Sequence, residues 1–185
     1  ASGNEGSLTG WSLIIDHDNS TPSNPPAASG TTYNGNSFTL SRLSTSSQKL
    51  NITDTGTIKD INVKLSGNHP NNINFNISLI SPYGTIVKLS NSMTGYAFEQ
   101  TVFDDEASTT ISNGQTPYLG SFKPADPLSA FDSEEMKGEW TLTVYNASGN
   151  EGSLTGWSLI IDHDNSTPSN PPAASGTTYN GNSFT

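Results

Sequence analysis

Three consecutive acidic residues are the part of this sequence best suited to chemistry. Asp104, Asp105 and Glu106 stand side by side in a chain with few charged side chains. Calcium takes about six to eight oxygen ligands, and neighbouring carboxylates together with loop carbonyls supply them. Carboxylates this close repel one another unless a cation or backbone N–H groups compensate their charge. This run is therefore the best candidate for a calcium site; the competing interpretation is a solvated loop in which one aspartate caps a turn.

The histidines do not form a catalytic or zinc-binding pattern. The chain has His69 and His163, together with His17 as the copy of His163 in a repeated segment. A serine hydrolase needs a nucleophile, a base and an orienting acid within hydrogen-bond reach, and no Gly-x-Ser-x-Gly turn accompanies these histidines. Zinc would require further ligands, and the chain has no cysteine. The sequence therefore predicts a protein that is not an enzyme.

Composition and charge narrow the class of partner. The formal net charge of −10 disfavours nucleic acid and anionic membrane surfaces. No apolar run approaches the roughly 18 to 20 residues of a membrane-spanning helix. Ser, Thr, Asn and Gly are abundant, as suits solvent-facing strand positions and turns. We expect a secreted, extracellular or cell-surface protein with no nucleic-acid partner and no membrane insertion.

A letter-for-letter internal repeat organises the chain. Residues 147–185 repeat residues 1–39 without a single difference, at an offset of 146 residues. Chance does not produce an identity of this length, and ordinary repeats diverge. Two explanations remain: a long array of near-identical repeats, or one period of a polymer written with overlapping ends. Both predict that the main partners are neighbouring copies of the same chain.

The repeated segment contains the strand expected to drive assembly. Trp11, Leu13 and Ile15 occupy alternate positions, which is the pattern of a half-buried strand. Alone, such a strand would expose its apolar face and an unpaired backbone edge. We expect it to be the last strand of the preceding repeat or a strand donated to a partner. Its copy, with residues Trp157, Leu159 and Ile161, is expected to complete the domain held in this chain.

Linkers rich in Pro, Ser and Thr separate the predicted units. Such segments bury too little apolar surface to fold alone, and adjacent prolines favour an extended backbone. The expected boundaries are 1–16 for the neighbouring or donated strand, 17–36 for a linker, 37–162 for one β-sandwich, 163–182 for a second linker and 183–185 for the start of the next repeat.

Inside residues 37–162 the pattern is all-β. Trp140, Leu142 and Val144 alternate with threonines, and similar alternation covers 61–65 and 73–79. Short strands of this kind, separated by turn signals, predict an antiparallel β-sandwich. Further strands are expected at 37–43, 48–52, 86–89 and 97–103.

Glycine and proline mark the expected turns and loops. Turn signals lie at 66–68, 81–84 and 148–150. The segment 113–136 carries three prolines and is predicted to be a long ordered loop. One turn of helix is expected within it, near Ser133–Met136.

Four motifs, in this order, resemble the P domain of proprotein convertases and of many bacterial secreted proteins. They are residues 79–85 (LISPYGT), 103–107 (FDDEA), 138–144 (GEWTLTV) and 152–159 (GSLTGWSL). The resemblance covers roughly residues 50–162. It implies a jelly-roll-like antiparallel β-sandwich of about eight strands, tandemly repeated here. Its expected core signature is Trp140, Leu142, Val144, Pro82 and Gly84.

The resemblance also bears on activity. In proteases of this family, the P domain follows the catalytic domain, stabilises it and does no catalysis itself. Our first functional interpretation is a structural repeat of an extracellular filament, sheath or surface fibre, because identical units joined by one repeated contact generate a filament. The alternative is an accessory or adhesive module, glycan-binding or attached to a protease. Tyr83, Tyr96 and Tyr118 are then the candidate sugar contacts, since Trp140 and Trp157 are expected in the core.

Overall fold

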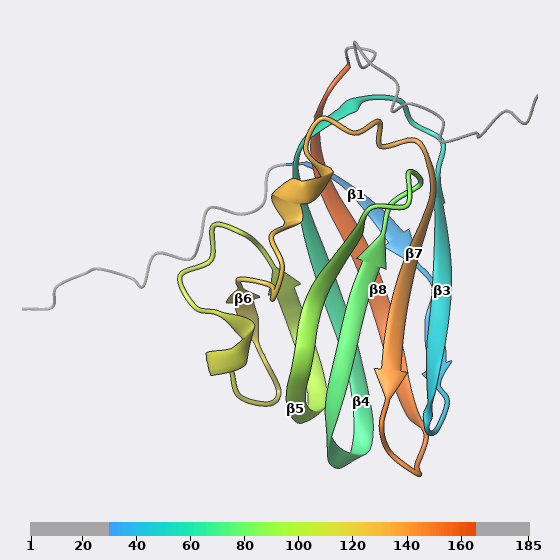
Figure 1. The fold of residues 1–185 in the computed structure, drawn as a ribbon, viewed down its shortest axis with the longest axis vertical. Helices are drawn as coiled ribbons and strands as arrows, with labels where there is room; N and C mark the ends of the chain where they lie inside the picture. Colours follow the sequence, from blue (N-terminus) through green and yellow to red (C-terminus); the bar gives the residue numbers. More distant parts are fainter. Residues whose placement is uncertain (1–29, 166–185) are drawn as a thin grey trace, which may run out of the picture.

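Eight strands and two short 3-10 helices make up the part of the chain that the computed structural model describes, residues 30–165 (Figure 1). Within that part, no helix is long and apolar enough to cross a membrane. The elements, in chain order, are β1 (Thr31–Gly35), β2 (Phe38–Leu40), β3 (Ser44–Ile52), β4 (Thr57–Ile80), β5 (Ile86–Phe103), η1 (Ile111–Asn113), β6 (Gly120–Phe122), η2 (Leu128–Phe131), β7 (Gly138–Asn146) and β8 (Gly152–Asp164).

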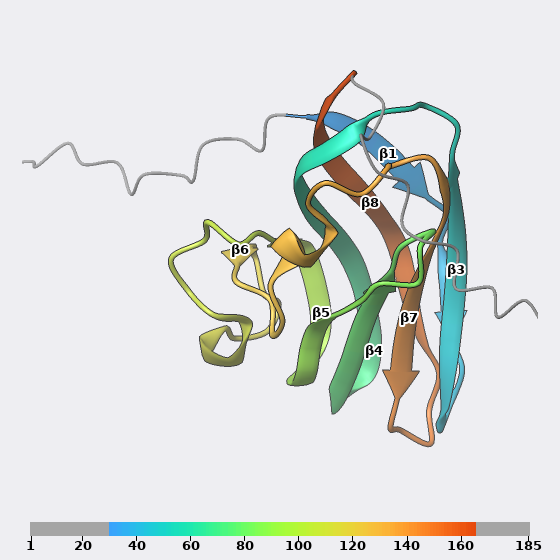
Figure 2. The ribbon, with the colours of Figure 1, turned by 45° about the horizontal axis from the view of Figure 1, so that its top comes forward.

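The strands form two facing layers that share β4 and β5 (Figures 1 and 2). In one layer the order is β1, β8, β4, β5 and β6, with β2 continuing β1 along β8. In the other, the second half of β4 pairs with β7, and β7 pairs with the edge strand β3. Every pairing is antiparallel except that of β5 with β6. The all-β, jelly-roll-like sandwich predicted from the sequence is therefore confirmed.

The core lies between these layers and is built from the inward-facing members of alternating strands. Trp140, Leu142 and Val144 on β7 are completely buried. Phe131, from η2, packs edge-on against Trp140, with ring centroids 5.1 Å apart. The Trp140 indole Nε1 donates a hydrogen bond of 2.9 Å to the Met136 carbonyl oxygen. This bond satisfies the polar edge of a buried aromatic ring and ties the segment before β7 to the core.

The turn at Pro82 and Gly84 joins the two longest strands. Ser81 N–H donates to the Thr85 carbonyl oxygen at 2.9 Å, and the Ser81 hydroxyl accepts from the Thr85 N–H at 3.3 Å. Gly84 has a φ of 85°, a left-handed conformation in which a side chain is strained. The Pro82 ring would lie 2.7 Å from a Cβ added to Gly138 at the start of β7. The motif predicted from Pro82 and Gly84 thus forms a tight turn packed on β7.

Two strands extend into segments predicted to be linkers. β1 lies within the predicted linker 17–36, and β8 continues past residue 162 to Asp164. β1 carries polar side chains because it is an edge strand, which needs backbone pairing on one side only. Its composition therefore resembles that of a linker. β4 also runs through the turn expected at 66–68, with a register shift at Gly67 in its pairing with β5 and β8.

The segment between β5 and β7 contains more structure than the long loop predicted for 113–136. It includes β6 and η2, and its helical turn lies at Leu128–Phe131 rather than near Ser133–Met136. Tyr118, predicted as a loop residue, is 4% exposed. Its hydroxyl donates to the Thr94 carbonyl oxygen at 2.7 Å. It is therefore a packing residue and not a sugar contact.

Candidate functional site

Asp104 and Glu106 lie in the turn that follows β5. Asp104 is only 6% exposed, and its Oδ1 accepts a hydrogen bond of 2.7 Å from the Glu106 backbone N–H. The pKa of the Glu106 carboxyl is raised above its usual range, mainly by a side-chain hydrogen bond with Asp104 and secondly by burial. The two carboxyl groups are thus held close together.

Asp105 has a different task from its neighbours. Its Oδ1 accepts from the Leu128 N–H at 3.0 Å, and its Oδ2 accepts from the Ser129 N–H at 2.9 Å. The first N–H groups of a helical turn have no partner within it, so a carboxylate placed there stabilises the turn. Asp105 therefore caps η2 and connects the end of β5 to the segment that precedes β7.

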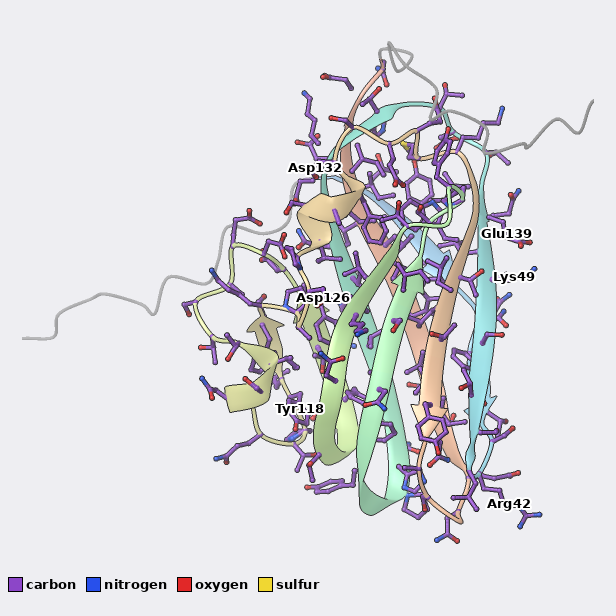
Figure 3. All side chains as sticks on the ribbon, viewed as in Figure 1. Arg42, Lys49, Tyr118, Asp126, Asp132 and Glu139 are labelled. Atoms are coloured by element: carbon purple, nitrogen blue, oxygen red, sulfur yellow. The ribbon has the colours of Figure 1, made fainter. Side chains whose placement is uncertain are left out.

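Two further carboxylates approach this turn from other elements. The pKa of Asp60 on β4 is raised, mainly by burial and secondly by the negative charge of Asp104. The pKa of Asp132, which directly follows η2 (Figure 3), is also raised, mainly by burial and secondly by the charge of Asp60. No spacing rule links these residues to the run at 104–106, because only the tertiary fold brings β4 and the end of η2 to the same place.

Asn62 lies beside this acidic cluster, which we define as Asp60, Asp104, Glu106 and Asp132. Its Nδ2 donates to the Asp60 carboxylate at 3.1 Å. The Asn62 side chain is 2% exposed, and its Oδ1 accepts no hydrogen bond from any described residue. Among residues 30–165, no group of three or more His, Cys, Asp or Glu side chains is arranged to hold a metal ion. Calcium at Asp104, Asp105 and Glu106 therefore stays a prediction.

The second candidate site is the place of β8 within the sheet, which we call the β8 slot. On one side β8 pairs with β1 and β2, and on the other with the first half of β4. Trp157, Leu159 and Ile161 are almost completely buried. The predicted strand is thus an inner strand of the sandwich. Its copy at Trp11, Leu13 and Ile15 lies outside the described residues.

Glycine at position 35 leaves room in the β8 slot for the side chain of Trp157. Gly35 is the register partner of Trp157. A Cβ added to Gly35 would lie 2.1 Å from indole atoms Cε2 and Nε1 of Trp157, far inside van der Waals contact. The indole therefore packs directly against the backbone of β1. Only glycine permits this contact, and the polar composition of β1, typical of a linker, gives no sign of it.

His69, on β4, is a packing residue. His69 is 4% exposed and packs edge-on against Phe75, with ring centroids 6.0 Å apart. Its Nε2 lies 3.0 Å from the Asn150 carbonyl oxygen, in the turn before β8. His69 thus helps to hold that turn.

Sequence comparison identifies the family. Residues 58–161, more than half of the chain, match the proprotein convertase P-domain family. No curated protein matches the chain by sequence.

Structural comparison gives distant neighbours. The serine protease of Aeromonas sobria, in complex with its chaperone and alone, is 16% identical over 72% and 71% of this chain, with TM-scores of 0.44 and 0.43. The chain spans only 27% of the protease chain. FLHE is 12% identical, with a TM-score of 0.43, over 72% of this chain and 96% of its own. P domains are accessory, non-catalytic domains of proteases, and on the match over residues 58–161 this chain belongs to the proprotein convertase P-domain family.

Proposed function

We propose that this chain is a non-catalytic repeat unit of an extracellular filament, sheath or surface fibre, in which P-domain sandwiches recur every 146 residues. One observation carries the proposal. The sandwich has one β8 slot, occupied by Gly152–Asp164, and the chain contains a second, identical copy of that strand at residues 6–18.

The physical reason is the apolar face of β8. Fully burying a side chain of this type contributes about 1.5–3 kcal/mol, and β8 buries four of them, at Leu154, Trp157, Leu159 and Ile161. A second strand with the same face and no sheet to join would be an aggregation hazard. A neighbouring sandwich that takes up this strand removes the hazard. A series of sandwiches, each with its own β8 strand, therefore explains why the strand is repeated.

The fold also indicates how successive units would be arranged. Thr31, the first residue of β1, pairs with Ile161 near the end of β8. The chain therefore enters and leaves the sandwich at the same end, as Figure 1 shows. The linker of twelve residues, 19–30, spans at most about 40 Å when extended. We expect neighbouring sandwiches to lie side by side, with the linkers joining them at one end, rather than end to end.

An accessory or adhesive module of a larger secreted protein is the second candidate. Membership of the P-domain family supports it, because P domains accompany the catalytic domains of proteases. Glycan binding belongs to this candidate. Of the tyrosines proposed as sugar contacts, Tyr83 and Tyr96 are exposed, whereas Trp140 and Trp157 are buried.

Calcium binding at the acidic cluster is a further part of the proposal. Asn62 Oδ1 is a buried acceptor without a donor next to carboxylates that repel one another, and calcium would satisfy both. Calorimetric titration of the whole chain with calcium is expected to give saturable binding that Asp104→Asn abolishes and the distant Glu151→Gln does not. Absence of binding in the unsubstituted chain contradicts a calcium site.

Electron microscopy of the native extracellular material tests the main proposal. Ordered filaments that give very large polypeptides on a denaturing gel support a covalent array. Filaments that dissociate into chains near one period support assembly by strand exchange between chains. A soluble particle without filaments contradicts the proposal and favours the accessory module.

A further inference from the structure

The contacts that hold β8 in its slot are made by β8 itself and by the turn before it. In that turn, the Ser148 carbonyl oxygen accepts from the Leu43 N–H at 2.9 Å. The Asn150 carbonyl oxygen accepts from Asn146 Nδ2, also at 2.9 Å. Residues 1–18 are identical to 147–164. The first copy therefore carries every group that the second copy brings to these contacts.

The topology allows the first copy to reach the slot of its own sandwich. β8 is antiparallel to β1, and Thr31 is opposite Ile161. A Cβ added to Gly30 would lie 2.6 Å from the Ile161 carbonyl, so the chain enters β1 directly beside the end of β8. Residue Asp18 precedes Thr31 by a linker of twelve residues, 19–30. A connection of this length joins antiparallel neighbours without strain.

We infer that the two copies compete for one β8 slot within a single chain, so that the sandwich has two alternative completions. In the first completion, residues 152–164 follow β7 into the slot, as the structure shows. In the second, residues 6–18 enter it ahead of β1, which gives a circularly permuted order of the same strands. Either completion leaves one identical strand outside the sandwich. Its exposure therefore does not favour one completion over the other.

The connecting segments determine the balance between the two completions. Five residues, 147–151, join β7 to β8, whereas twelve residues, 19–30, would join the first copy to β1. Loop-closure probability falls with length to about the power 3/2, so the shorter connection is favoured roughly fourfold. The permuted completion is therefore the minor form, populated at about one chain in five.

Engineered disulfides distinguish the two completions because the chain has no cysteine of its own. Asn34 pairs with Ser158 in the ladder between β1 and β8, and Ser12 is the copy of Ser158. Paired residues of antiparallel strands have Cα atoms about 4.5–5.5 Å apart, within the range of a disulfide. The full chain with Asn34→Cys, Ser12→Cys and Ser158→Cys is equilibrated in a thiol redox buffer.

Tryptic cleavage separates the products. Residues 1–42 carry positions 12 and 34, whereas residues 138–185 carry position 158. A 34–158 bond therefore links two peptides, and a 34–12 bond closes a loop within one. We expect both in monomeric protein, in a ratio of about four to one. The two-cysteine chain Asn34→Cys with Ser12→Cys should close completely.

A chain with Asn34→Cys and Thr9→Cys is the control, because the copy of Thr9, Thr155, is not opposite Asn34. Its thiols should stay free. Closure of the control as readily as of the test pair overturns the inference, and so does a 34–12 bond found only between chains or not at all. The inference goes beyond the proposed function and does not require it. If both bonds form while the native material lacks filaments, the proposed function fails and the inference stands.

Discussion

The β8 slot and the connection between β5 and β7 are built on opposite principles. β8 is a regular inner strand, paired on both sides, and its stability comes from periodic apolar burial. The connection, residues 104–137, has little regular pairing and is held by particular contacts, such as the Asp105 carboxylate on η2. The chain holds two copies of β8 but one copy of the connection. A periodic strand can be replaced by its copy, whereas the connection has no substitute.

Paired tryptophan substitutions give the largest contrast between these regions. Trp140→Ala removes a fully buried indole that packs on Phe131 in the connection, and should lower the free energy of unfolding by about 3–5 kcal/mol. Trp157→Ala should cost only about 0.8 kcal/mol, the loop-closure cost of placing the copy with Trp11 in the slot. Chemical denaturation of both variants measures this. Equal losses would show that the copy does not replace β8.

Gly35→Ala tests the slot from the β1 side. The added methyl group would meet the Trp157 indole at 2.1 Å, and overpacking of this kind costs about 1–3 kcal/mol. Occupation of the slot by the first copy gives no relief, because Trp11 would meet the same methyl group. The matched control is Gly181→Ala, in the copy of β1, which should leave the melting temperature unchanged. A tolerated Gly35→Ala contradicts the close packing of β1 on the indole.

Asp105→Ala tests the connection. Loss of the cap on Leu128 and Ser129 should reduce stability by about 1 kcal/mol. Asp105→Asn keeps one acceptor oxygen and should recover part of the loss. Glu151→Ala, at an exposed position outside the connection, is the control. Thermal unfolding of the three variants checks the order. A harmless Asp105→Ala would mean that η2 does not depend on its cap.

Substitution of Tyr33 is expected to have the smallest effect. Its titration reports on β1, the strand at the edge of the β8 slot. Its hydroxyl donates to Asp54 Oδ2 at 2.8 Å. Burial, then Asp54, raise the pKa of Tyr33 from 10.0 to about 12. Because the folded pKa is raised, the stabilisation is complete below pH 10 and is lost as the pH rises through about 12. Phenolate absorbance should show a late-titrating tyrosine that Tyr33→Phe removes and Tyr179→Phe, in the copy, does not. An unchanged titration in Tyr33→Phe contradicts the assignment.

The sequence predicted the sandwich well because its strands follow local rules. Alternation on β7 and β8 marked Trp140 and Leu159 as inward-facing, and both are completely buried. The turn at Gly84 was visible from proline and glycine alone. β1 was missed since an edge strand needs no apolar alternation, so its polar residues resembled the linker.

The acidic cluster was only partly predictable. The run at 104–106 was evident, but Asp60 and Asp132 join it through tertiary contacts between β4 and the segment after η2. Asn62 joins it through its hydrogen bond to Asp60. The cap by Asp105 likewise depends on a partner more than twenty residues away, at Leu128. No local pattern encodes such distances. Periodic structure could therefore be predicted from the sequence, whereas side-chain contacts between distant segments could not.

Unfolding of the full chain carrying Leu159→Asp, alone and together with Leu13→Asp, tests the central claim most directly. Leu159 is fully buried on β8, and Leu13 is its copy. The account predicts that Leu159→Asp alone keeps a cooperative thermal transition in a monomeric chain, and that the double substitution abolishes it. Leu13→Asp alone should leave the transition unchanged. Loss of the transition in Leu159→Asp alone would contradict the claim that either copy of β8 completes the sandwich.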